Sequence, residues 1–137
     1  MRHDGSCAHR LPRRALASTN FRVGDQSLIA DELLVRVAER LKVLGQPVRL
    51  RLIEKLTAGP STPQELSDVI GTSQQNVSKH LLVLYRAGIV SRRPEGSNVY
   101  YSLADSAARA VLDEMLASVK RQLRELSELA TQPPEEA

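Results

Sequence analysis

Apolar side chains recur every three or four residues along most of this 137-residue chain, and that interval is the period of a helix with one buried face. Breaks in the pattern fall at glycine and proline, as at Gly45 before Pro47 and at Gly59 before Pro60. The pattern therefore predicts five helices, over about residues 27–44, 47–58, 63–70, 74–86 and 106–130.

The third and fourth of these helices are short and carry clear boundary signals. Thr62 and Glu65 form a capping box, in which a hydroxyl and a carboxylate satisfy free backbone N–H groups. Gly71 ends the third helix, and Thr72 or Ser73 caps the fourth. The turn between them has only about three residues, which is typical of a helix-turn-helix. The apolar side of the third helix is expected at Leu66, Val69 and Ile70.

After Gly88 the apolar period changes to two, which is the period of a strand. Residues 89–93 and 98–103 are predicted as two strands, and the Pro-Glu-Gly-Ser segment 94–97 as the turn that joins them. A hairpin that follows a helix-turn-helix forms a wing. The predicted fold class is therefore mainly α with a small β-hairpin (α+β), a winged helix-turn-helix that dimerises through its first and last helices.

The fourth helix carries the features that point to DNA. With residues 75–86 placed about 100° apart around a helix, one face is apolar and is expected to point into the core: Val77, Leu81, Leu84 and Tyr85. The other face has amide, hydroxyl and cationic groups and no carboxylate, and such groups bind base edges and phosphates. With the polar residues of the hairpin, the predicted DNA-binding residues are Ser73, Gln74, Gln75, Asn76, Ser78, Lys79, His80, Arg86, Arg92, Arg93 and Asn98.

The last helix has an apolar stripe at alternating spacings of four and three residues, as in a coiled coil. Because a monomer would expose this long stripe to water, a homodimer through the first and last helices is predicted. A two-fold dimer implies a pseudo-palindromic double-stranded DNA operator. The predicted interface residues are Leu33, Val37, Leu112, Leu116, Val119, Leu123 and Leu126.

Charge divides the chain into segments. Residues 1–24 hold five arginines and one aspartate, so this part carries +4 while the rest sums to −1, for a net charge of +3. We expect a basic, disordered arm over residues 1–26, the winged-helix domain over 27–130 and a disordered acidic tail over 131–137. A basic arm can contact nucleic acid or another polyanion.

Composition argues against several other classes of protein. No apolar run approaches the ~20 residues of a membrane helix, and no apolar segment follows the N-terminal arginines as in a secretory signal, so a cytoplasmic protein is expected. One Phe, three Tyr and no Trp disfavour a stacking platform for single-stranded nucleic acid. Without paired carboxylates, a nucleophile beside a base or a Gly-rich phosphate loop, neither an enzyme nor a bound cofactor is expected.

Three stretches resemble the ArsR family of transcriptional regulators. Residues 44–53 (LGQPVRLRLI) resemble the opening of the family's second helix, and residues 73–90 resemble its recognition helix and the entry to its wing. Residues 95–101 (EGSNVYY) resemble the return strand of the wing. The resemblance covers roughly residues 30–130 and implies a winged-helix homodimer, a repressor that leaves its operator when an inducer binds.

The family's best-known inducers are metals and metalloids, so the resemblance also identifies where their ligands would lie. The cysteine pair of the arsenic- and cadmium-type site falls on Thr62 and Gln64. The ligands of the zinc- and cobalt-type site fall on Asp105, Ala107, Ser118 and Arg121. Such ions require thiolate or imidazole ligands, and a helix N-cap explains the one carboxylate, so neither site is expected to form.

Two alternatives remain open from the sequence. In the N-terminal arm, His3, Cys7 and His9 are chemically competent ligands and provide the basis for a metal- or thiol-responsive repressor. A single cysteine can form a disulfide only across a dimer. The other alternative is a winged-helix protein-interaction module that does not bind DNA, and the acid-free face of the fourth helix argues against it.

Overall fold

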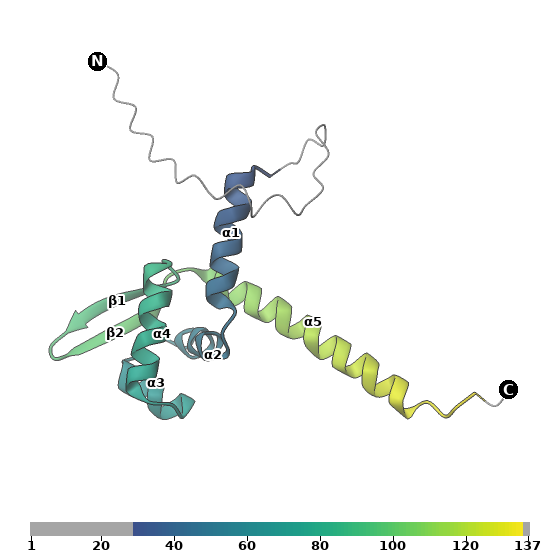
Figure 1. Cartoon of the computed structure of the whole chain (residues 1–137). Helices are drawn as coiled ribbons and strands as arrows, with labels where there is room; N and C mark the ends of the chain where they lie inside the picture. The colour runs from purple at the N-terminus through teal and green to yellow at the C-terminus, as the bar shows by residue number, and fades with distance from the viewer. Residues whose placement is uncertain (1–28, 136–137) are drawn as a thin grey trace, which may run out of the picture.

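The computed structural model describes residues 29–135, which form five helices and one two-stranded antiparallel sheet (Figure 1). The helices and strands closely follow the predicted order and fold class. Their bounds are α1 Asp31–Leu44, α2 Pro47–Leu56, α3 Pro63–Ile70, α4 Gln74–Arg86, β1 Val90–Glu95, β2 Asn98–Leu103 and α5 Ser106–Thr131.

The hydrophobic core lies between α2, α3, α4 and the base of the hairpin. Each of these elements contributes side chains that are almost completely removed from water, while α1 adds only Leu44 at its end and α5 only Ala108 near its start. The largest fully buried residues are Leu52, Ile53, Leu66, Val77, Leu81, Leu84, Ile89 and Val90. We call α2, α3, α4 and the hairpin the body, and the body rigidly positions the site described below.

Side-chain caps begin α3 and α4, and Gly71 ends α3 at the turn between them. The Thr62 hydroxyl accepts from the Glu65 N–H and the Glu65 carboxylate accepts from the Thr62 N–H, each at 3.2 Å, so the predicted capping box is confirmed. Gly71 ends α3 with a φ of 80°, a left-handed conformation that favours glycine. The Ser73 hydroxyl then accepts from the Asn76 N–H at 3.1 Å and begins α4.

The hairpin is longer than predicted and is tied to the body. Strand β1 continues through Pro94 and Glu95, so the turn contains only two residues, Gly96 and Ser97. Pro94 fits there because it lies next to the turn of a two-stranded ribbon, where proline is tolerated. Ser61, in the linker from α2, exchanges two backbone hydrogen bonds with Tyr101 of β2 at 2.9 and 3.0 Å, which fastens the wing to the start of α3.

Two residues of the predicted apolar faces are exposed, and the assignment of Tyr85 to the core was wrong. Val69 of α3 is 63% exposed and Tyr85 of α4 is 39% exposed. Tyr85 instead lies against Arg92 of β1, whose guanidinium is 4.4 Å from its ring centroid. The start of α1 also differs, because Ile29 and Ala30 precede the helix, which begins at Asp31.

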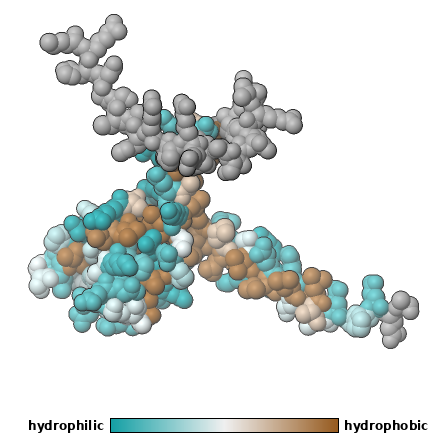
Figure 2. Space-filling view, viewed as in Figure 1, coloured by the Kyte–Doolittle hydropathy of each residue, from teal (hydrophilic) through white to brown (hydrophobic). Residues whose placement is uncertain are grey.

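Helices α1 and α5 extend away from the body in different directions (Figure 1). Apolar atoms remain visible along α5 in the space-filling view (Figure 2), and the apolar residues of both helices are mostly exposed. No helix between residues 29 and 135 combines the length and the apolar character that crossing a membrane requires.

Candidate nucleic-acid interface

The N-terminal half of α4 presents the predicted groove-facing residues on a well-defined helix start. Gln74, Gln75 and Lys79 are exposed, while Asn76 and Ser78 are half-buried. The Asn76 side-chain amide donates to the Thr72 hydroxyl at 3.0 Å, so both Thr72 and Ser73 contribute to the helix start. Amide and ammonium groups therefore project into solvent where the helix begins.

Helix α4 contains no acidic residue, so every polar group on its exposed face is either neutral or cationic. The free N–H groups and the dipole at a helix N-terminus favour an approaching anion, and Lys79 adds a full positive charge one turn later. This end of α4 is therefore suited to a polyanion that also offers hydrogen-bonding edges, as the DNA major groove does.

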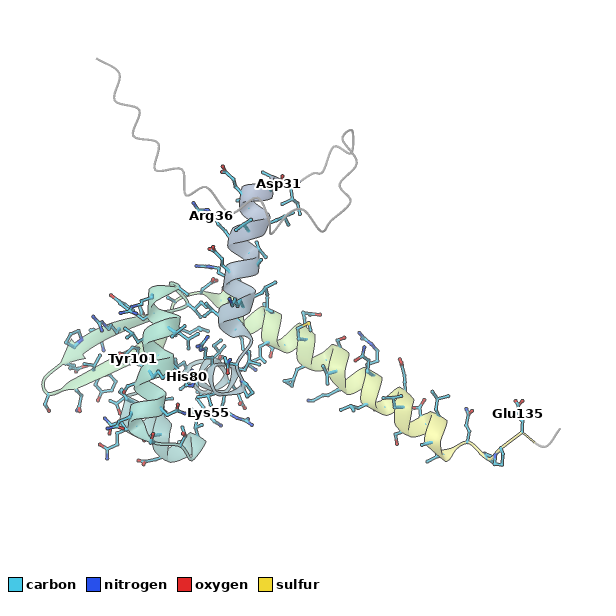
Figure 3. The ribbon with its side chains drawn as sticks, in the orientation of Figure 1. Asp31, Arg36, Lys55, His80, Tyr101 and Glu135 are labelled. Carbon is cyan, nitrogen blue, oxygen red and sulfur yellow. The ribbon has the colours of Figure 1, made fainter. Side chains whose placement is uncertain are left out.

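His80 faces back toward α2, and its side chain is half-buried there (Figure 3). Its Nδ1 accepts from Nε of Arg49 at 3.1 Å, and Arg49 also donates to the Val43 carbonyl at 3.0 Å. Burial first, and then the charges of Arg49 and Lys79, lower the pKa of His80 below its ordinary value of 6.5. The ring is therefore neutral near pH 7, with its proton on Nε2.

Arg86 lies at the other end of α4, more than three helical turns from Gln75. It lines a groove of about 830 Å³ between α1 and α4, together with Arg36, Arg40 and Val83. Thus Arg86 shares a helical face with Gln75 but neighbours α1, and the structure does not bring it together with the residues at the start of α4.

The two wing arginines lie on opposite faces of the hairpin because successive residues of a strand alternate. Arg92 is paired with Tyr101 in the sheet register, and its guanidinium lies 4.4 Å from the ring centroid of Tyr85, a cation–π contact. Arg93 donates to the Glu95 carboxylate at 3.2 Å. Asn98 is exposed at the tip of the wing, opposite Glu95 in the register.

Three contact residues at this site were not identified from the sequence. Tyr85 was assigned to the core but makes the cation–π contact with Arg92. Arg49 donates a hydrogen bond to His80, and Glu95 forms an ion pair with Arg93. Glu95 was the easiest to find, because it lies two residues from Arg93 on the same strand face. Arg49 lies 31 positions from His80, and no local pattern signals that pairing.

The positions of the family's metal sites hold no thiolate or imidazole, and two of their oxygen-bearing side chains are engaged in other contacts. The Thr62 hydroxyl is used in the helix cap, and Asp105 accepts from the Ala107 N–H at 2.9 Å and pairs with Arg40. Among residues 29–135, no cluster of three His, Cys, Asp or Glu side chains could hold an ion. His3, Cys7 and His9 lie outside the described residues.

The predicted dimer residues lie along the two extended helices. All are exposed except Leu112, which is half-buried against the body. Leu33 and Val37 lie on α1, whereas Leu116, Val119, Leu123 and Leu126 continue the stripe on α5. Their exposure shows that nothing within residues 29–135 covers either stripe.

Comparison with known proteins shows similarity to transcriptional regulators. Residues 44–93 match a family model described as "Helix-turn-helix domain". The chain is 36% identical over 81 residues to the regulator NmtR of Mycobacterium tuberculosis, a match that covers 59% of this chain and 68% of NmtR.

Two solved structures have the same fold. One is the antimony-specific transcriptional repressor AntR, with 26% identity and a TM-score of 0.65 over 74% of this chain and 93% of AntR. The other is the homodimeric winged helix-turn-helix DNA-binding domain of Mb0332 from Mycobacterium bovis, described as a possible ArsR-family regulator. It is 26% identical, with a TM-score of 0.61 over 72% of this chain and 91% of that domain.

Proposed function

This chain belongs to the ArsR family of winged helix-turn-helix transcriptional regulators, and from that premise we propose that it represses transcription as a homodimer on a double-stranded operator. The observation that carries the proposal is the start of α4, where exposed amides and Lys79 lie on a capped helix without a single carboxylate. In this proposal α4 enters the major groove, and the wing contacts the neighbouring backbone.

The two parts of this interface have different roles. Gln75 reads bases, because an amide can bind the edge of adenine at two points. Arg92 and Arg93 neutralise phosphates, although in the free protein Arg92 stacks on Tyr85 and Arg93 pairs with Glu95. The wing contact therefore requires Arg93 to exchange a carboxylate for a phosphate, whereas the exposed amide of Gln75 needs no such exchange.

Substitutions in the two parts test this division. An operator is first selected from a library of random duplexes by repeated rounds of binding, and affinity is then measured by fluorescence anisotropy at several salt concentrations. We expect Gln75→Ala to weaken operator binding by about 1–3 kcal/mol while binding to random DNA changes little. Arg92→Ala should weaken both and reduce the slope of log K against log salt by about two, one contact per protomer.

Arg51→Ala is the matched control for loss of an arginine. Arg51 is exposed and pairs with Glu54 on the side of α2 that faces α5, away from the start of α4. Its loss should leave both DNA affinity and the salt slope nearly unchanged. Equal affinities of wild type, Gln75→Ala and Arg92→Ala for every duplex would contradict DNA binding through the helix-turn-helix.

The repressor that we propose does not use the family's metal sites. Thr62 and Gln64 supply no thiolate, and Arg121 would repel a cation at the other site. Zinc, cadmium and arsenite should therefore not release the protein from its operator. A stoichiometric metal effect on DNA affinity that disappears in Cys7→Ser would instead assign sensing to the N-terminal segment.

The protein that we propose is a cytoplasmic regulator and not an enzyme. Its relatives are transcriptional regulators, and the polar groups at the start of α4 are arranged for binding, with no acid–base pair among them. The homodimer uses the apolar stripes of α1 and α5, as the homodimeric state of the Mb0332 domain supports.

A further inference from the structure

Arg40 joins three elements that are far apart in the sequence. It projects from α1, and its Nη1 donates to Oδ2 of Asp105 at 2.5 Å, immediately before α5. Its Nη2 donates to the Ala87 carbonyl, at the end of α4, at 3.2 Å. One guanidinium thus connects the two extended helices to the helix that carries the proposed DNA-reading residues.

Each acceptor of Arg40 belongs to a residue that caps a helix. Ala87 is the C-cap of α4, so its carbonyl has no partner within the helix and lies at the end that favours a cation. Asp105 is the N-cap of α5, and its second oxygen accepts from the Ala107 N–H. A Cβ at Gly88 would lie 3.4 Å from Nη2 of Arg40, which shows how closely the guanidinium approaches the turn.

Packing alone only weakly determines the orientation of α4 relative to α1. The groove of about 830 Å³ separates these helices, and the Arg40 side chain crosses it. The guanidinium is half exposed and the Asp105 side chain is 25% exposed, so the ion pair contributes little to stability. Its planar fork nevertheless fixes the angle between two acceptors, which a lysine ammonium cannot do.

We propose that Arg40 is a positioning residue that sets the orientation of α4 relative to the dimer helices, and thereby the spacing of operator half-sites that the dimer accepts. This inference rests on the proposed function, because it assumes a dimer held by α1 and α5 that reads two half-sites. A dimer places its two reading helices about one turn of DNA apart, so a small rotation of each α4 changes the preferred spacing. Arg40 touches neither the proposed bases nor the proposed phosphates.

The test uses the full chain and duplexes derived from the selected operator. One set carries both half-sites with zero to three base pairs added or removed between them, and a second set carries one half-site. We expect Arg40→Lys and Asp105→Asn to weaken binding at the preferred spacing by roughly five- to 150-fold, the usual range for coupling between two sites. The preference among spacings should flatten, while single half-site affinity, dimerisation and melting temperature stay unchanged.

Asp105→Asn is informative because asparagine still caps α5 but removes the charge that holds Arg40. Arg36→Lys is the control, since Arg36 lines the same groove without contacting Ala87 or Asp105.

An unchanged spacing preference, or equal losses of affinity for duplexes with one and with two half-sites, would overturn the inference. If Arg40→Lys lowers the melting temperature, the spacing preference of Asp105→Asn tests the inference instead. Failure of the wild type to select any duplex would instead overturn the proposed function.

Discussion

The body and the two extended helices have the same helical periodicity but bury their apolar residues differently. In the body, Leu52 and Ile53 are completely buried against their neighbours. On α5, Leu123 is 61% exposed although it belongs to an equally regular stripe, and Leu33 and Val37 on α1 are also more than half exposed. The periodicity identifies an apolar face in both regions, but it does not identify what covers that face.

This difference indicates two sources of stability. The body has its own core and should respond to mutation through cavities and lost caps. Apart from Leu44, Ala108 and Leu112, which pack against the body, the apolar stripes of the extended helices are uncovered within residues 29–135. They gain free energy from burial only against another molecule. The following four predictions test this division, beginning with the largest expected effect.

Placing aspartate at both Leu116 and Leu123 should dissociate the dimer. Two carboxylates per protomer would enter an apolar interface without partners, and their burial should cost at least about 3 kcal/mol of dimerisation free energy. That cost corresponds to a hundredfold or greater rise in the dimer Kd. Sedimentation equilibrium measures this change directly. Leu129→Asp is the matched control, because Leu129 is exposed on the same helix but lies off the stripe. An unchanged Kd in the double variant would locate the interface elsewhere.

In the body, Leu52→Ala should lower the free energy of unfolding by about 2–5 kcal/mol, because it leaves a cavity among fully buried side chains. Urea denaturation followed by circular dichroism at fixed protein concentration measures the loss. Leu129→Ala removes the same atoms from an exposed position and should change the free energy of unfolding by about 0.5 kcal/mol or less. Similar losses in both variants would contradict the division between body and extended helices.

Removing the α3 cap should have a smaller effect within the body. Thr62→Ala deletes the hydroxyl that accepts from the Glu65 N–H and should cost about 1 kcal/mol of unfolding free energy. Thr62→Ser keeps the hydroxyl and serves as the control in the same urea titration. If serine and alanine destabilise equally, the cap hydrogen bond is not what stabilises this end of α3.

The smallest effect is a pH dependence caused by His80. Because its pKa is lowered in the folded protein, the folded state favours the neutral ring relative to the unfolded chain. This contribution to stability is complete above the unfolded pKa of about 6.5. It is lost as the pH falls from there through the lower, folded-state pKa. His80→Gln should therefore reduce the dependence of the melting temperature on pH between about 7 and 5. A dependence identical to that of the wild type would contradict the assignment, since His3 and His9 are present in both proteins.

Local signals account for the parts of the fold that were predicted correctly and for the polar face of α4. The capping box, Gly71 and Ser73 fix the helix-turn-helix through contacts within four positions of one another, so the sequence specifies them directly. The second strand, Asn98–Leu103, follows from its alternation in the same way. The exposed residues at the start of α4 were predicted because their helical position depends only on a regular helix.

The sequence by itself determined the order of elements, the caps and the acid-free face of α4, because each depends on interactions between near neighbours. Only the tertiary structure decided that Tyr85 lies under Arg92, that His80 accepts from Arg49, and that Arg40 connects α1 to Asp105 across 65 positions. Such contacts arise from how helices cross and where each one ends. A periodic pattern records which face of a helix is apolar, but it contains no information about which distant side chain reaches that face.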